Sequence, residues 1–119
     1  MAETYRWIER GTERVLWLDD PQQPGARYLA VRPQPGGDDE WFAACRLGPD
    51  EPEREVGDGL AGARVAEDVI LKYAIKALAS AHGVSSAPGI PDEDASDAEL
   101  VIARLWRVLT ERWAPPGAT

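Results

Sequence analysis

The sequence predicts a two-layer α+β domain, in which an antiparallel β-meander of about four strands precedes two C-terminal amphipathic helices. Three observations lead to this prediction. Over the first 48 residues, apolar and polar residues alternate in short runs, which is the pattern of half-buried strands. Short Gly- and Pro-rich segments separate these runs, and short connections favour antiparallel neighbours. From residue 63 onward, apolar residues instead recur at helical spacing.

Each predicted strand is bounded by turn residues. A first hairpin is expected around Gly11-Thr12, because a short loop containing glycine joins two apolar runs there. The prolines of residues 21–25 and 33–39 lack the amide that a central strand needs, so these segments are read as loops. The expected strands span about residues 5–10, 15–18, 27–32 and 40–47. We expect residues 48–62 to form an irregular acidic crossover with a short extended piece near residues 54–56.

The first helix is predicted over residues 63–82, with Gly83 as its C-terminal stop. Apolar residues cover more than half of its circumference, which is more than one neighbouring layer can bury. A second stripe is formed by Leu71, Ile75 and Leu78. Either the second helix or another copy of the chain must cover this stripe. A homodimer through the helices or through an exposed sheet edge is therefore expected.

The second helix is predicted over residues 97–113. Ser96 and the glutamate three residues later, Glu99, form a capping box at its start. One apolar face is expected from Ile102, Leu105, Trp106, Leu109 and Trp113. Because Pro115-Pro116 cannot continue the helix, we expect a single domain over residues 1–114 and a disordered tail over residues 115–119.

Composition favours a soluble cytoplasmic protein. No apolar run approaches the ~18–20 residues of a membrane span, and the N-terminus lacks the apolar segment of a secretory signal. Eleven of the 13 basic residues are arginine, a usage typical of GC-rich bacterial genomes. The net charge is −8, and residues 49–62 alone carry five acids against one arginine. Such an acidic chain is not expected to bind the phosphate backbone of nucleic acids.

The sequence has few residues of the types that catalyse reactions or bind metal ions. The chain has one histidine, His82, and one cysteine, Cys45, too few for a zinc cage. His82 lies in the last helical turn, and Cys45 is read as a buried structural thiol within a strand. The acidic run that begins at Asp92 lacks the glycine and the terminal acid of a calcium-binding loop. We therefore expect no metal and no cofactor, and a non-catalytic protein rather than an enzyme.

Tryptophan and arginine provide the first candidate site. Trp7 and Trp17 belong to adjacent strands and can stack on one face, beside Arg6 and Arg14. The helices either cover this face, which makes the tryptophans part of the core, or leave it exposed. An exposed patch of aromatic residues and arginines is typical of protein-binding surfaces. The sequence therefore favours a protein-interaction or regulatory module, with inhibitor-like, antitoxin-like and chaperone-like roles as candidates.

The alternative function is a small-ligand binding protein or a modest enzyme. A pocket between sheet and helices is its expected site, because a curved sheet capped by helices can leave a cavity. Arginine side chains in this pocket would bind an anion, and aromatic side chains would line the pocket. The residues expected to line this pocket are Tyr28, Arg32, Trp41, Arg46 and Tyr73.

Overall fold

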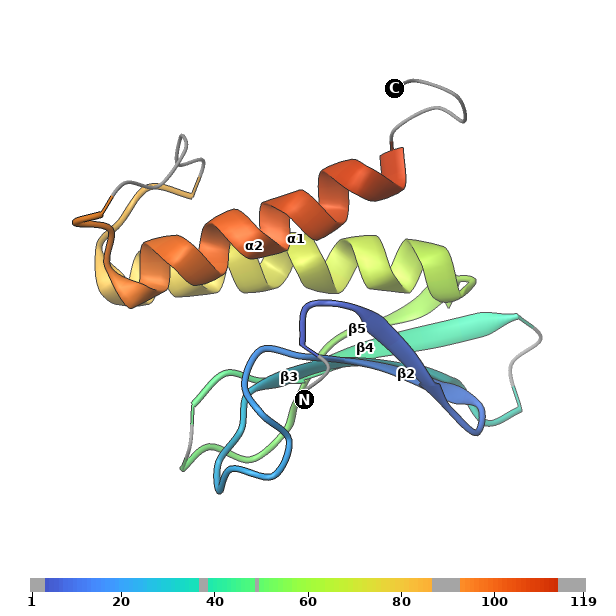
Figure 1. Ribbon diagram of the computed structural model, residues 1–119. Helices are drawn as coiled ribbons and strands as arrows, with labels where there is room; N and C mark the ends of the chain where they lie inside the picture. Colours follow the sequence, from blue (N-terminus) through green and yellow to red (C-terminus); the bar gives the residue numbers. More distant parts are fainter. Residues whose placement is uncertain (1–3, 37–38, 49, 87–92, 114–119) are drawn as a thin grey trace. The chain divides into compact units, whose positions relative to one another are not determined.

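The computed structural model describes residues 4–36, 39–48, 50–86 and 93–113 (Figure 1). Five strands precede two helices, which confirms the predicted α+β class with five strands in place of about four. The strands are β1 (Trp7–Arg10), β2 (Glu13–Trp17), β3 (Tyr28–Pro33), β4 (Glu40–Arg46) and β5 (Arg54–Ala61). The helices are α1 (Ala63–His82) and α2 (Asp97–Trp113).

The chain divides into two compact units, Met1–Ala74 and Ile75–Thr119, with the boundary inside α1. The first unit holds the whole sheet and the first part of α1. The second holds the remainder of α1 and all of α2. The predicted tail at residues 115–119 lies outside the described residues. Within the part of the chain that the structure describes, no helix has the length and apolar character needed to span a bilayer.

The sheet is an antiparallel meander in the order β1-β2-β3-β4-β5 (Figure 1). Its first hairpin closes through Gly11 and Thr12, because Arg10 pairs with Glu13. Gly11 has φ of 63°, a conformation that glycine adopts without steric cost and that suits the first position of such a loop. This two-residue loop sets the register of β1 against β2, and therefore decides which side chains share a face.

Register divides the side chains of the sheet between two faces. One face, here called the helix face, carries the buried residues Leu16, Leu29, Val31, Ala43 and Cys45. The first part of α1 packs on it: a methyl group at Gly57 of β5 would lie 3.7 Å from Cγ1 of Val69. An ion pair between Arg14 and Glu67 also joins β2 to α1. The opposite side of the sheet is here called the outer face.

Strand β5 is longer than the sequence predicts. An extended piece was expected only near residues 54–56, yet the strand covers all eight residues of Arg54–Ala61. It pairs only with β4 in the sheet order, so it is an edge strand. The pairing of β5 with β4 shifts register twice, between Trp41 and Ala43 and between Ala43 and Ala44. Edge strands tolerate glycine and acidic residues, which is why apolar alternation failed to reveal this one.

The helix ends form as predicted. Ser96 Oγ accepts the amide of Glu99 at 3.2 Å, and Glu99 Oε1 accepts the amide of Ser96 at 3.4 Å, which completes the capping box. At the end of α1, Gly83 has φ of 65° and the amide of Val84 donates to the carbonyl of Ala79. In α2, Ile102, Leu105 and Leu109 are buried. Trp106 is half-buried, and the side chain of Trp113 lies outside the described residues.

The apolar stripe of α1 gives no evidence for a homodimer, which stays a prediction. The sequence predicts that either the second helix or another copy of the chain covers Leu71, Ile75 and Leu78. In the single chain they are 0%, 2% and 3% exposed, respectively. No second subunit is needed to bury this stripe.

Candidate functional site

A network of polar side chains occupies the outer face of the sheet, centred on Arg32 of β3. Arg32 Nε donates to Glu13 Oε2 at 2.6 Å. Its Nη1 and Nη2 atoms donate to the two carboxylate oxygens of Glu53 at 2.7 and 2.8 Å. The hydroxyl of Tyr28 donates to Glu53 Oε1 at 2.7 Å. Four side chains from three segments of the chain are thereby held in one arrangement.

The sheet brings these groups together in two ways. Arg14 pairs with Val31, so the next position places Glu13 beside Arg32 on the outer face. Glu53 precedes β5, and its carboxylate crosses β4 to reach two residues of β3. The crossing is open because Ala44 of β4 and its cross-strand partner Ala30 have small side chains. Both alanines are buried, at 1% and 0% exposed.

Electrostatics stabilises the charged form of this network. The hydrogen bonds from Arg32 hold the pKa of Glu53 below its usual value, against the opposing effect of partial burial. The same bonds raise the pKa of Arg32. Burial, followed by the bond to Glu53, raises the pKa of Tyr28. Two carboxylates share one guanidinium, so the charge of Arg32 is fully compensated.

Aromatic rings flank the network on both sides. Trp17 and Tyr28 are cross-strand neighbours with ring centroids 5.2 Å apart and planes tilted by 54°. The guanidinium of Arg32 lies 6.0 Å from the ring centroid of Phe42, its cross-strand partner on β4. All four side chains are half-buried, so each keeps part of its surface accessible.

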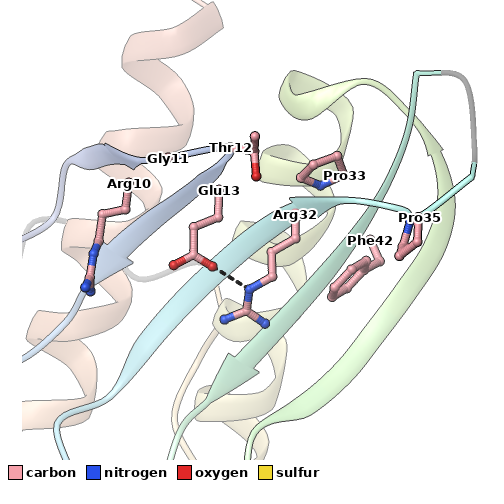
Figure 2. A pocket seen from close by; sticks show the side chains of 8 residues that line it. All are labelled: Arg10, Gly11, Thr12, Glu13, Arg32, Pro33, Pro35 and Phe42. Carbon is pink, nitrogen blue, oxygen red and sulfur yellow. Dashed lines mark hydrogen bonds and ion pairs between the residues drawn. The ribbon is translucent and has the colours of Figure 1, made fainter.

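A hollow of about 480 Å³ opens on the outer face beside the first hairpin loop. Figure 2 shows the side chains of Arg10, Glu13, Arg32 and Phe42 extending to the same side of the sheet. The hairpin loop forms one rim and the segment after β3 forms another. The remaining lining residues are Gly11, Thr12, Pro33 and Pro35.

The hollow has an apolar wall and a balanced set of charges. Phe42 and Pro35 supply the wall. Glu13 and Arg32 neutralise each other. Arg10 is exposed, and within the described residues its guanidinium has no ion-pair partner. Because Glu13 and Glu53 both bind Arg32, their second negative charge balances that of Arg10, which lies opposite Glu13.

The predicted interaction surface is distributed over both faces. Trp7 pairs with Leu16 and lies on the helix face, whereas Trp17 pairs with Tyr28 and lies on the outer face. The expected stacking of Trp7 on Trp17 is therefore wrong, because a two-residue hairpin loop places them out of register. Arg14 is on the helix face with Glu67, at 2.7 Å. Arg6 is exposed just before β1.

The residues of the predicted pocket are likewise separated. Register places Tyr28, Arg32 and Arg46 on the outer face, and Trp41 on the helix face opposite Pro33. Tyr73 belongs to α1 and accepts a hydrogen bond from Arg54 at 3.3 Å. The structure thus brings together Tyr28 and Arg32 through Glu53, and does not bring Trp41 or Tyr73 to them.

Sequence reasoning did not select Glu13, Glu53 or Phe42 for the site. Glu13 and Phe42 could have been found from the register, since each is one position from a pairing that the hairpins imply. Glu53 carried no such signal, because residues 48–62 were read as an irregular acidic segment. The buried carboxylate of Glu67 was also missed, since its helix position resembles that of an ordinary solvated acid.

Metal and nucleophile chemistry has little support in the described residues. Within residues 4–36, 39–48, 50–86 and 93–113, no group of His, Cys, Asp and Glu side chains could hold a metal ion. Asp92, at the start of the acidic run, lies outside them. Cys45 is buried, as predicted, and burial raises its pKa to about 11. A thiol of that pKa carries almost no thiolate at neutral pH.

Comparison with protein-family models, with curated proteins and with solved structures gives no match to this chain. The function is therefore argued from the geometry of the outer face.

Proposed function

We propose that this chain is a non-catalytic protein-interaction or regulatory module that binds its partner through the outer face of the sheet. One observation carries the proposal: Glu13 and Glu53 hold the half-buried side chains of Arg32 and Tyr28 in place, and Trp17 packs against Tyr28. Trp, Tyr and Arg are the residues that most often dominate binding energy at protein interfaces. The inhibitor-like, antitoxin-like and chaperone-like roles all use such a surface.

Preorganisation is what favours binding here. A free arginine side chain loses roughly 0.5–1.5 kcal/mol of conformational freedom when a partner immobilises it. Arg32 is already immobilised by three hydrogen bonds to carboxylates, so this loss occurs on folding and not on binding. Trp17 and Tyr28 have few rotatable bonds and pack against each other. A partner would therefore meet a rigid surface.

The same network argues against the alternative anion site at Arg32. Its Nε, Nη1 and Nη2 atoms all donate to Glu13 or Glu53. An incoming anion at this guanidinium would be repelled by the two carboxylates that already bind it. This observation favours protein binding over the pocket enzyme as the role of the Arg32 network.

Site-specific photocrosslinking tests the proposal. A photoreactive phenylalanine analogue replaces Phe42 on the outer face, and in a control variant it replaces Ser80, which is exposed on α1. We expect one protein to be crosslinked from position 42 and not from position 80. The purified partner should then bind the unmodified chain stoichiometrically and bind Trp17→Ala more weakly. Equal crosslinking from both positions, or unchanged binding by the variant, would contradict the proposal.

A further inference from the structure

We infer that the hollow beside the first hairpin loop receives an uncharged aromatic side chain of the partner protein. The inference rests on the proposed function and specifies the chemistry of one part of that contact. Three properties of the hollow lead to it: its balanced charges, its apolar wall, and the way in which Arg32 is hydrogen-bonded.

The charged groups in and beside the hollow balance one another. Arg10 and Arg32 are the two positive groups, and Glu13 and Glu53 are the two negative groups. Glu13 lies opposite Arg10 in the pairing of β1 with β2, and both glutamates bind Arg32. A charged group that entered the hollow would lose hydration without meeting a net opposite charge. The lining therefore favours an uncharged occupant.

The side of the hollow away from Arg10 is apolar. Figure 2 shows Phe42 and Pro35 on the other side of Arg32 from Arg10 and Glu13. Phe42 is half-buried, so part of its ring remains open to contact. The volume of about 480 Å³ lies within the range of ligand-binding clefts and is ample for an aromatic side chain. A ring placed against Phe42 and Pro35 would bury apolar surface on both partners.

Arg32 favours an aromatic ring over an aliphatic group as the occupant. Three of its N–H groups donate to carboxylates, and the N–H bonds of a guanidinium all lie in its plane. These hydrogen bonds leave the planar faces for stacking, a contact that arginine makes with aromatic rings. The guanidinium lies 6.0 Å from the ring centroid of Phe42. A second ring beside Phe42 can therefore contact both an aromatic side chain and the guanidinium.

The hollow is continuous with the rest of the outer face. Arg32 lines it and is also the centre of the network that reaches Tyr28 through Glu53. Trp17 packs against Tyr28 on the far side of that network. A partner that covers Trp17 and Tyr28 can extend across Arg32 and place an aromatic side chain in the hollow.

Phe42 is the only phenylalanine of the chain, so its ring is a unique reporter of the hollow. The full chain is labelled with ¹³C in phenylalanine alone and titrated with unlabelled N-acetyl-phenylalaninamide, an uncharged aromatic probe. We expect saturable shifts of the Phe42 ring signals in the NMR spectrum, with a Kd on the order of 1–10 mM for so small a ligand. N-acetyl-leucinamide, which is apolar without a ring, should bind about threefold more weakly. N-acetyl-phenylalanine, which carries a carboxylate, should bind no more tightly than the amide.

Two variants test the contribution of the ring. Phe42→Leu keeps an apolar side chain, and it should weaken binding of N-acetyl-phenylalaninamide by about threefold, measured at the backbone amide of Arg32. Val65→Ala, which shortens an exposed apolar side chain of α1, should leave binding unchanged.

Four results would overturn the inference. They are no saturable shift at Phe42, equal binding of the phenylalanine and leucine amides, tighter binding of the charged probe, and an equal effect of the two variants. The first three are measured on the natural chain and do not depend on the folding of a variant.

The partner found by crosslinking separates the inference from the proposed function. If that partner loses affinity for Trp17→Ala but not for Phe42→Leu, the interaction surface stands and the aromatic site in the hollow does not. Loss of affinity with both variants supports both. Unchanged affinity with both variants contradicts both.

Discussion

At the residue scale, Glu67 of α1 is a charged side chain in the core of the first unit. It is a charged residue with 0% exposure, and its carboxylate lies 2.7 Å from Nη1 of Arg14. Arg14 itself keeps about a third of its side chain exposed, at 32%. The two partners are therefore not equivalent. If Glu67 is replaced, water can still reach the guanidinium of Arg14, whereas if Arg14 is replaced, the carboxylate of Glu67 stays in the core.

Removing Arg14 should accordingly be costly. We expect Arg14→Met to lower the free energy of unfolding by about 3 kcal/mol, because it leaves the Glu67 carboxylate buried without its arginine. The double variant Arg14→Met/Glu67→Met should recover more than half of that loss, since no charge then remains buried. Urea denaturation of the three chains measures this. A loss below about 1 kcal/mol for the single variant would show that the pair is not essential to the packing of α1 on the sheet.

At the element scale, the start of α2 shows how a short local motif specifies a boundary. Ser96 and Glu99 exchange hydrogen bonds: each backbone amide donates to a side-chain oxygen of the other residue. These bonds satisfy amides at the first turn that have no partner inside the helix. All of these groups lie within five residues of one another, so the sequence contains everything needed to form the cap.

The cap can be tested with a matched pair of serine substitutions. Ser96→Ala should reduce the free energy of unfolding by about 1 kcal/mol, because the Glu99 amide loses its side-chain acceptor. Ser80→Ala, at an exposed position inside α1, should change it by less than about 0.5 kcal/mol. Thermal and urea unfolding of both variants provides the comparison. Equal effects would mean that the cap contributes nothing beyond helix propensity.

At the scale of the whole molecule, ion pairs make stability depend on pH. Arg27 donates two side-chain hydrogen bonds to Asp19 at 2.8 and 2.9 Å and lowers the pKa of that carboxyl. Arg32 lowers the pKa of Glu53 in the same way. When a carboxyl has a lower pKa in the folded state, the unfolded chain binds more protons at acidic pH. Stability is then full above the unfolded-state pKa and falls as pH drops through the folded-state value.

Glu53→Gln isolates one part of this pH dependence. At neutral pH the variant should be less stable by about 1 kcal/mol, a figure discounted because a third of the Glu53 side chain is solvent-exposed. As pH falls below about 4.5, the unfolded-state value for this glutamate, the variant should lose less further stability than the natural chain. Unfolding measured across this pH range tests the expectation. Parallel curves for the two chains would show that Glu53 gains no stabilisation from Arg32.

Prediction from sequence succeeded where the deciding interactions are local. The hairpin at Gly11-Thr12, the two helices and their ends follow from turn residues, apolar period and capping residues. It succeeded only partly for the candidate site. Arg32 and Tyr28 were selected, but they were grouped with Trp41 and Tyr73, which lie on the other side of the sheet or on α1. The alternation of apolar and polar residues shows that a strand has two different faces. It does not show which of the two faces packs against a helix.

The sequence by itself determined the α+β order of strands and helices, the hairpin loop and the helix boundaries, because each depends on residues only a few positions apart. Only the tertiary structure decided that β5 completes the sheet and that Glu53 crosses β4 to hold Arg32. These features depend on strand register and on contacts between segments about 20 residues or more apart in the chain. Register is a property of paired strands, so no single strand sequence carries it.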